Sequence, residues 1–188
     1  DLHGVFVGAF VTAFAPILWS VNNKNKKRSS SLFKSIISIS ALLGCLGVCL
    51  SIIIGPIILP LKYQSALTIV PYLSIGFIFG SYGSLYGLLL EKKYRVNIRI
   101  LSIICGAFVN FLIIYLTIED LEILGLAIST LAGYFTVFLI NYIFAEQEYR
   151  KLLWNKDLIF SIFVISIFII VYRDVWFLNL SFLLFSVL

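Results

Sequence analysis

Uncharged polar residues at helical spacing are the first candidates for chemistry in this sequence. Asn110 occurs in the middle of an apolar run, and Thr130, Tyr134 and Asn141 follow in the next run at steps of four and seven. Such steps place residues on one face of an α-helix. An amide or hydroxyl among apolar residues needs a hydrogen-bonding partner. These four side chains therefore either bond to a neighbouring helix or line a lumen and contact a polar substrate.

A second candidate group consists of the basic residues Lys92, Lys93, Arg95 and Arg99, which directly follow the apolar run 66–90. A basic cluster next to a membrane attracts an anionic lipid headgroup or a pyrophosphate. Basic residues in such a turn also orient a membrane protein, because Lys and Arg are retained on the cytoplasmic side. The sequence leaves both interpretations open. Under the first, the four residues form a cytoplasmic entrance.

Other kinds of chemistry lack the residues that they require. No charged residue occurs in the middle of an apolar run, which argues against an ion-channel ring or a proton relay in this part of the chain. The single histidine, His3, has no metal-spaced or nucleophilic partner. Glu119, Asp120 and Glu122 are better explained as a solvated turn than as ligands of a divalent ion. We therefore expect no enzymatic activity, no metal site and no cofactor.

The composition indicates an integral membrane protein. Hydrophobic residues make up 61% of the chain and charged residues only 12%, whereas soluble domains contain about a quarter charged residues. The net charge of +5 comes from basic residues in short turns rather than on one amphipathic face, so we do not expect nucleic-acid binding. The sequence begins at Asp1 and contains no methionine, so we expect a fragment of a longer protein.

Apolar runs recur along the whole chain and predict an all-α fold, a polytopic transmembrane helix bundle of about seven spans. The runs are 4–21, 32–59, 66–90, 96–118, 121–145, 158–172 and 175–188. We predict a five-span bundle over 1–145, a cytoplasmic connector over 146–157 and a C-terminal transmembrane hairpin over 158–188. If the turns alternate in side, only Lys62 and Arg173 fall on the side opposite to the other basic residues. This asymmetry places Asp1 outside and the chain end inside.

Glycines at regular spacing predict where helices pack closely. Four of them lie on one face of the third run and two on one face of the second: Gly76, Gly80, Gly83, Gly87, and Gly44, Gly47. Small residues in this register allow helix backbones to approach each other in lipid. Pro71 is expected to kink the third helix near its start.

Four segments together resemble a known family. They are AFVTAFAPILWS, PLKYQSALTIVPYLSIGFIFGSYGSLYGLLLEKKYR, GAFVNFLIIYLTI and ILGLAISTLAGYFTVFLINY. Their order is similar to the C-terminal half of bacterial polysaccharide exporters, the O-antigen and capsule flippases of the multidrug, oligosaccharidyl-lipid and polysaccharide exporter (MATE-like) superfamily. Pro16, Tyr63, Ala66, Asn110 and Gly125 match positions that are typical of this family.

The resemblance implies a fold and a function. It implies two six-helix lobes that alternate between inward-open and outward-open states, and this chain would be the C-terminal lobe plus two extra helices. The partners would be the missing N-terminal lobe of the same chain, membrane lipid, a polyprenyl-linked oligosaccharide, and the polymerase and chain-length proteins of polysaccharide synthesis. The expected location is the bacterial inner or plasma membrane, where the protein would flip the lipid-linked oligosaccharide outward.

Three alternatives remain open from the sequence. A cation-coupled antiporter for drugs or metabolites in the same superfamily would require an apolar lumen and a carboxylate in the missing lobe. A membrane-embedded transferase or polymerase of polysaccharide synthesis would require catalytic side chains in a large outer loop, and the outer turns here are short. A non-catalytic structural bundle would leave the polar faces unexplained.

Overall fold

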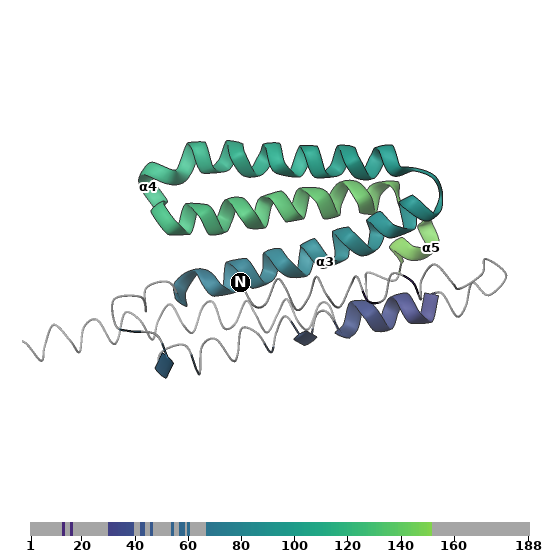
Figure 1. The fold of residues 1–188 in the computed structure, drawn as a ribbon, viewed down its shortest axis with the longest axis horizontal. Helices are drawn as coiled ribbons and strands as arrows, with labels where there is room; N and C mark the ends of the chain where they lie inside the picture. Colours follow the sequence, from purple (N-terminus) through teal and green to yellow (C-terminus); the bar gives the residue numbers. More distant parts are fainter. Residues whose placement is uncertain are drawn as a thin grey trace, which may run out of the picture.

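The computed structural model describes residues 30–39 and 67–151, together with the single positions 13, 16, 42, 43, 46, 54, 57, 58 and 60. All regular structure in the two continuous segments is helical, which confirms the predicted all-α class (Figure 1). Gly44, Gly47 and the runs 158–172 and 175–188 lie outside the described residues. The count of seven spans and the domain boundaries therefore stay predictions.

The helix α3, Val70–Lys92, begins at a proline and ends in charged residues. Pro71 lies in the first turn of α3, where the missing N–H removes no helical hydrogen bond. Pro71 therefore lies at the start of α3, directly after the 3₁₀ turn 67–69, and the predicted kink there stays a prediction. Glu91 and Lys92 are still helical, so α3 continues beyond the predicted end at residue 90.

The helix α4, Val96–Phe144, is a hairpin of two arms. Glu122 departs from helical geometry, with φ 45° and ψ −119°, and the chain reverses there (Figure 1). The first arm is 96–121 and the second arm is 123–144. This reversal falls in the acidic turn that the sequence predicts between two helices. The short helix α5, Gln147–Arg150, follows.

The glycine face of α3 packs on the second arm of α4, which lies between α3 and the first arm (Figure 1). A Cβ atom placed on Gly76 would lie 3.3 Å from Leu131 Cα, and one placed on Gly83 would lie 3.1 Å from Phe138 N. The equivalent position on Gly80 is 3.0 Å from the Tyr134 ring. Larger side chains on this face would push the helices apart.

The two arms of α4 come closest at a pair of glycines. A Cβ atom on Gly106 would lie 2.9 Å from the carbonyl oxygen of Gly133 and would overlap the Val137 side chain. A Cβ atom on Gly133 would lie 3.0 Å from the Gly106 carbonyl oxygen. This backbone contact is of the kind that small residues permit in membrane helices.

Two helical segments, Leu67–Lys92 and Val96–Phe144, are long and apolar enough to cross a membrane. At 1.5 Å per residue, the 49 residues of α4 amount to about 74 Å of helix, divided between the two arms. Each arm is therefore long enough for one crossing of a hydrocarbon core of about 30 Å. Large apolar side chains project from the first arm, and Phe108, Phe111 and Tyr115 are 65%, 69% and 74% exposed. These features agree with the predicted membrane class.

Candidate functional site

The turn between α3 and α4 brings the predicted entrance residues to one end of the helices. Tyr94 adopts a positive φ of 59°, and its amide donates to the Glu91 carbonyl at 2.9 Å. The Arg95 amide donates to the Leu90 carbonyl at 2.9 Å. These bonds satisfy the C-terminal carbonyls of α3 and reverse the chain. As a result Arg99, in the first turn of α4, returns beside Glu91.

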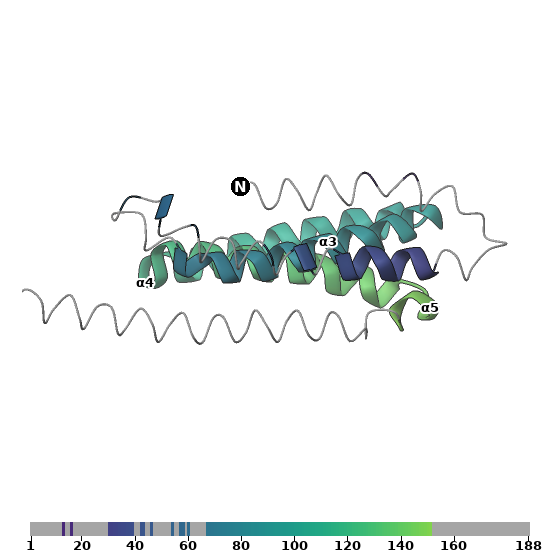
Figure 2. The ribbon, with the colours of Figure 1, turned by 90° about the horizontal axis from the view of Figure 1, so that it is seen from below.

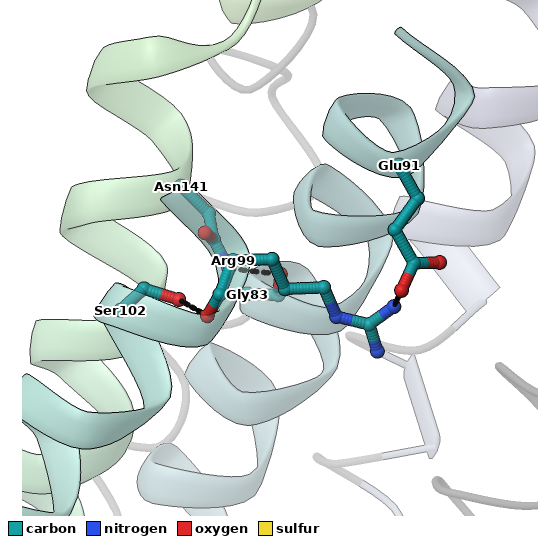
Figure 3. Close-up of polar contacts among 5 residues, drawn as sticks. All are labelled: Gly83, Glu91, Arg99, Ser102 and Asn141. Atoms are coloured by element: carbon teal, nitrogen blue, oxygen red, sulfur yellow. Dashed lines mark hydrogen bonds and ion pairs between the residues drawn. The ribbon is translucent and has the colours of Figure 1, made fainter. Parts of the chain in front are cut away.

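Two of the four predicted entrance residues form ion pairs. Arg99 pairs with Glu91, and the two side chains are 27% and 26% exposed (Figure 3). Lys93 Nζ lies 2.7 Å from Glu146 Oε1 in a more exposed pair. The hydrogen bond to Glu146 raises the pKa of the Lys93 ammonium, so Lys93 stays charged at neutral pH. The positive charges of Arg99 and Lys93 are therefore largely balanced within the chain.

The other two predicted entrance residues differ in their surroundings. Lys92 is the last residue of α3, is half-buried and interacts with other groups of the chain. Arg95 is exposed at the start of α4 and forms no ion pair with any described side chain. Among the four, Arg95 is the residue that is best placed to meet an anion from outside.

A buried layer of polar residues lies between the helices, next to the charged turn that joins α3 and α4. Asn141 is 1% exposed, and its Nδ2 donates to the Gly83 carbonyl at 2.9 Å, which joins the second arm of α4 to α3 (Figure 3). Ser102 is fully buried and its Oγ donates to the Arg99 carbonyl at 2.7 Å. A Cβ atom on Gly87 would lie 3.1 Å from the Arg99 side chain and 3.3 Å from Asn141 Nδ2. The small residues of α3 therefore make room for this layer.

Asn141 also has an acceptor that no described group uses. Its Oδ1 is buried and receives no hydrogen bond from any residue in the described part of the chain. A buried acceptor without a donor costs about 1–3 kcal/mol. The layer thus holds an amide that is only half satisfied.

The remaining predicted lumen residues lie at other places along the two arms of α4. Asn110 packs on Gly133 between the two arms of α4, with its Cβ 3.0 Å from the position of a Cβ on Gly133. Its Oδ1 is also buried without a partner among the described residues. Tyr134 lies over Gly80 and contacts the Phe77 ring at a centroid distance of 5.8 Å.

Thr130 bonds within its own helix, because its hydroxyl donates to the Leu126 carbonyl at 2.8 Å. The structure places the other three predicted lumen residues at two different interfaces. Tyr134 and Asn141 face the glycines of α3, whereas Asn110 lies between the arms of α4. The described contacts do not join them into one cluster.

Sequence reasoning missed two features. Glu91 was not expected as a partner of Arg99, and Gly133 was not expected at the interface between the arms of α4. Gly133 lies beside the small residues of its helix, so a wider search of that face would have found it. The Glu91–Arg99 pair has no comparable sequence signal. The two residues are on different helices, and only the geometry of the turn brings them together.

An aromatic cluster fixes the neighbouring segments to the same end of α3. The Tyr86 hydroxyl donates to the Tyr149 carbonyl at 3.0 Å. The Phe33 ring, on the helix Ser30–Ile39, contacts Tyr86 and Tyr149 edge-on at centroid distances of 5.2 Å and 5.4 Å. These contacts hold three segments together around fully buried Tyr86.

Replacing Tyr86 with phenylalanine tests this connection. Tyr86→Phe keeps the ring contact with Phe33 but removes the hydrogen bond to the Tyr149 carbonyl, so we expect about 1 kcal/mol of lost stability. Amide hydrogen exchange in α5 should become faster, because α5 loses one of its anchors. Tyr142→Phe is a matched control, since the Tyr142 hydroxyl forms no hydrogen bond with a described residue. Equal effects of the two changes would contradict the assignment.

Alanine substitutions at two predicted lumen residues should differ in effect. Asn141→Ala removes a bond between helices and leaves a cavity, so we expect about 1–2 kcal/mol of lost stability. Thr130→Ala removes a bond within one helix, so a change within about 0.5 kcal/mol is expected. Denaturant unfolding of the purified full-length protein in detergent measures both. A loss for Thr130→Ala as large as for Asn141→Ala would argue against Asn141 as a link between helices.

Comparison with known proteins finds no family model, no curated protein and no solved structure that matches this chain.

Proposed function

We propose that this chain is part of a transporter that flips a lipid-linked oligosaccharide across the bacterial cytoplasmic membrane, from the cytoplasmic to the outer leaflet. The movement would be conformational, by alternating access between two lobes. No bond of the substrate would be made or broken. The chain would supply the C-terminal lobe, and the polymerase and chain-length proteins of polysaccharide synthesis would act on the product.

The observation that carries this proposal is the unused hydrogen-bonding capacity of Asn110 and Asn141. Both side chains lie in or next to interfaces between apolar helices, and the Oδ1 atom of each has no described donor. Sugars present many hydroxyl donors, and an uncharged amide accepts from them without the desolvation penalty of a carboxylate. If the helices separate in another state of the transport cycle, these acceptors become available to a hydrated sugar chain.

The helix contacts identify the interfaces that the proposed cycle would have to open. The interfaces between α3 and α4 and between the arms of α4 are built from glycine against backbone or ring atoms, as at Gly83 and Gly106. Contacts of this kind hold membrane helices together by close packing. In the proposed cycle these are the contacts that would separate when Asn110 and Asn141 meet the substrate.

The test is a deletion of the full-length gene in its native host, followed by measurement of the membrane face on which lipid-linked oligosaccharide accumulates. We expect complete units to build up on the cytoplasmic face and surface polysaccharide to be lost. Complementation by the native gene should restore export, and complementation by Asn141→Leu should restore it only partly. Normal surface polysaccharide in the deletion strain, with no other exporter present, would rule the proposal out.

A further inference from the structure

Basic residues from three separate segments lie at one end of the described helices. Lys34 is on the helix Ser30–Ile39, Arg95 begins α4, and Arg150 and Lys151 end α5. These three segments lie at the same end of the bundle in two perpendicular views (Figures 1 and 2). We call these four residues the α5 basic cluster.

Specific contacts hold the segments of this cluster together. The Phe33 ring lies 5.4 Å from the Tyr149 ring, so the residue before Lys34 touches the residue before Arg150. The ion pair of Lys93 with Glu146 joins the turn that contains Arg95 to the start of α5. The cluster therefore results from tertiary contacts and is not a run of basic sequence.

The charges of the α5 basic cluster are not balanced by described side chains. Lys34, Arg95 and Lys151 are exposed, and none of them forms an ion pair with a side chain that the structure describes. The acidic residues Glu91 and Glu146 are paired with Arg99 and Lys93 instead.

Arg150 adds a second observation, which concerns hydrogen bonding. Its Nε is buried and donates to no group in the described part of the chain. A guanidinium has five N–H donors in a planar fork that matches the oxygens of a phosphate. A phosphate oxygen at Arg150 would supply an acceptor that the described residues do not.

We propose that the α5 basic cluster binds the phosphate of an anionic phospholipid headgroup at the membrane surface. The cluster lies where α3 ends and α4 begins, which is the level at which spanning helices leave the hydrocarbon core. Phosphate groups of lipids are concentrated at that level, and clustered Lys and Arg beside a spanning helix attract them. Tyr149, the residue before Arg150, has the amphipathic character of an interfacial side chain.

This lipid site shares only Arg95 with the predicted cytoplasmic entrance, and the variants that test it, at Arg150 and Lys151, lie outside the proposed transport path. The headgroup would be bound by residues outside the interfaces that contain Asn110 and Asn141, in the absence of any oligosaccharide. A failure of flipping in cells would therefore leave the lipid site in place, and a failure of lipid binding would leave the transport proposal in place.

The experiment titrates lipid against the purified full-length protein in detergent and counts bound lipids by native mass spectrometry. The probes are phosphatidylglycerol, phosphatidylcholine and inorganic phosphate. We expect saturable binding of phosphatidylglycerol and much weaker binding of phosphatidylcholine. The double variant Arg150→Gln with Lys151→Gln should weaken phosphatidylglycerol binding by about fivefold for each charge removed.

Two control variants separate a local site from net charge and from folding. Glu119→Gln with Asp120→Asn changes two charges beside the reversal between the two arms of α4, at the end of the helices opposite to α5 (Figure 1), and should leave lipid binding unchanged. Arg150→Lys keeps the charge but loses the planar fork, so its binding should fall less than that of Arg150→Gln. The thermal unfolding midpoint without lipid is measured for each variant, and only variants with a native midpoint are compared.

Three outcomes would overturn the proposal. Equal affinity for phosphatidylglycerol and phosphatidylcholine would show that the phosphate is not bound through charge. Unchanged phosphatidylglycerol affinity in the double variant would show that the lipid binds elsewhere. Saturable binding of inorganic phosphate that is tighter than that of phosphatidylglycerol would assign the cluster to a soluble anion instead of a lipid.

Discussion

Replacing Gly106 with valine is expected to separate the two arms of α4 and to lower the stability of the protein by about 3 kcal/mol. A Cβ atom at this position meets the Gly133 carbonyl oxygen at 2.9 Å and overlaps the Val137 side chain. The carbonyl belongs to helical backbone, so it cannot move away as a flexible side chain would. Valine adds two further methyl groups to a site that has no room for the first carbon.

Ala107→Val is the matched control for this change, because Ala107 is the next residue along the same arm and is exposed. We expect the control to change stability by no more than about 0.5 kcal/mol. Denaturant unfolding of the full-length protein in detergent measures both variants. If Gly106→Val yields no folded protein, Gly106→Ala is measured instead, because it adds only the Cβ atom and should lower the stability by a smaller amount. Equal stabilities of the Gly106 and Ala107 variants would show that the arms do not meet at Gly106.

Reversing the charge of Arg99 is expected to have the second largest effect. Arg99→Glu places a second carboxylate beside Glu91 in a partly buried site and removes the side chain that lies along Gly87. We expect a loss of about 2 kcal/mol, since hydrogen bonds to charged groups contribute about 1.5–3 kcal/mol. The same unfolding measurement applies.

The exchange of both charges, Glu91→Arg with Arg99→Glu, separates the ion pair from other effects. The native carboxylate lies in the last turn of α3 and the native cation in the first turn of α4, which is opposite to the arrangement that the helix dipoles favour. The exchange retains the net charge and corrects this polarity. We therefore expect the double variant to recover most of the stability lost in Arg99→Glu. No recovery would mean that Arg99 acts through its contact with Gly87 and not through its charge.

Local sequence patterns predicted the helical class and showed which face of α3 carries the small residues. The glycines of α3 are three or four residues apart, close to one helical turn, and the structure places Gly76, Gly80 and Gly83 against the second arm of α4. The acidic residues predicted the turn, and Glu122 is where α4 reverses. Patterns of this kind depend on the repeat of one helix and on the charged residues at its ends, so the sequence of a single segment is sufficient to reveal them.

Two predictions about α3 show the limit of local reasoning. The apolar run predicted a helix that starts at residue 66 with Pro71 inside it, yet α3 begins at Val70 after a 3₁₀ turn, and Pro71 is in its first turn. The charged residues Glu91 and Lys92 predicted the helix end, yet both are helical. Charge at a membrane surface limits how far a segment enters lipid, but it does not prevent helical hydrogen bonds, which continue until the turn at Tyr94.

The sequence by itself determined that this protein is helical and strongly apolar, that α3 has a face of small residues, and that basic residues gather in its turns. Only the tertiary structure decided which neighbour each face meets. It separated Asn110 from Asn141, paired Glu91 with Arg99, and brought Lys34 to the same end as Arg150. The physical reason is that the helical repeat defines a face from residues a few positions apart, whereas the neighbour of that face depends on how distant segments pack.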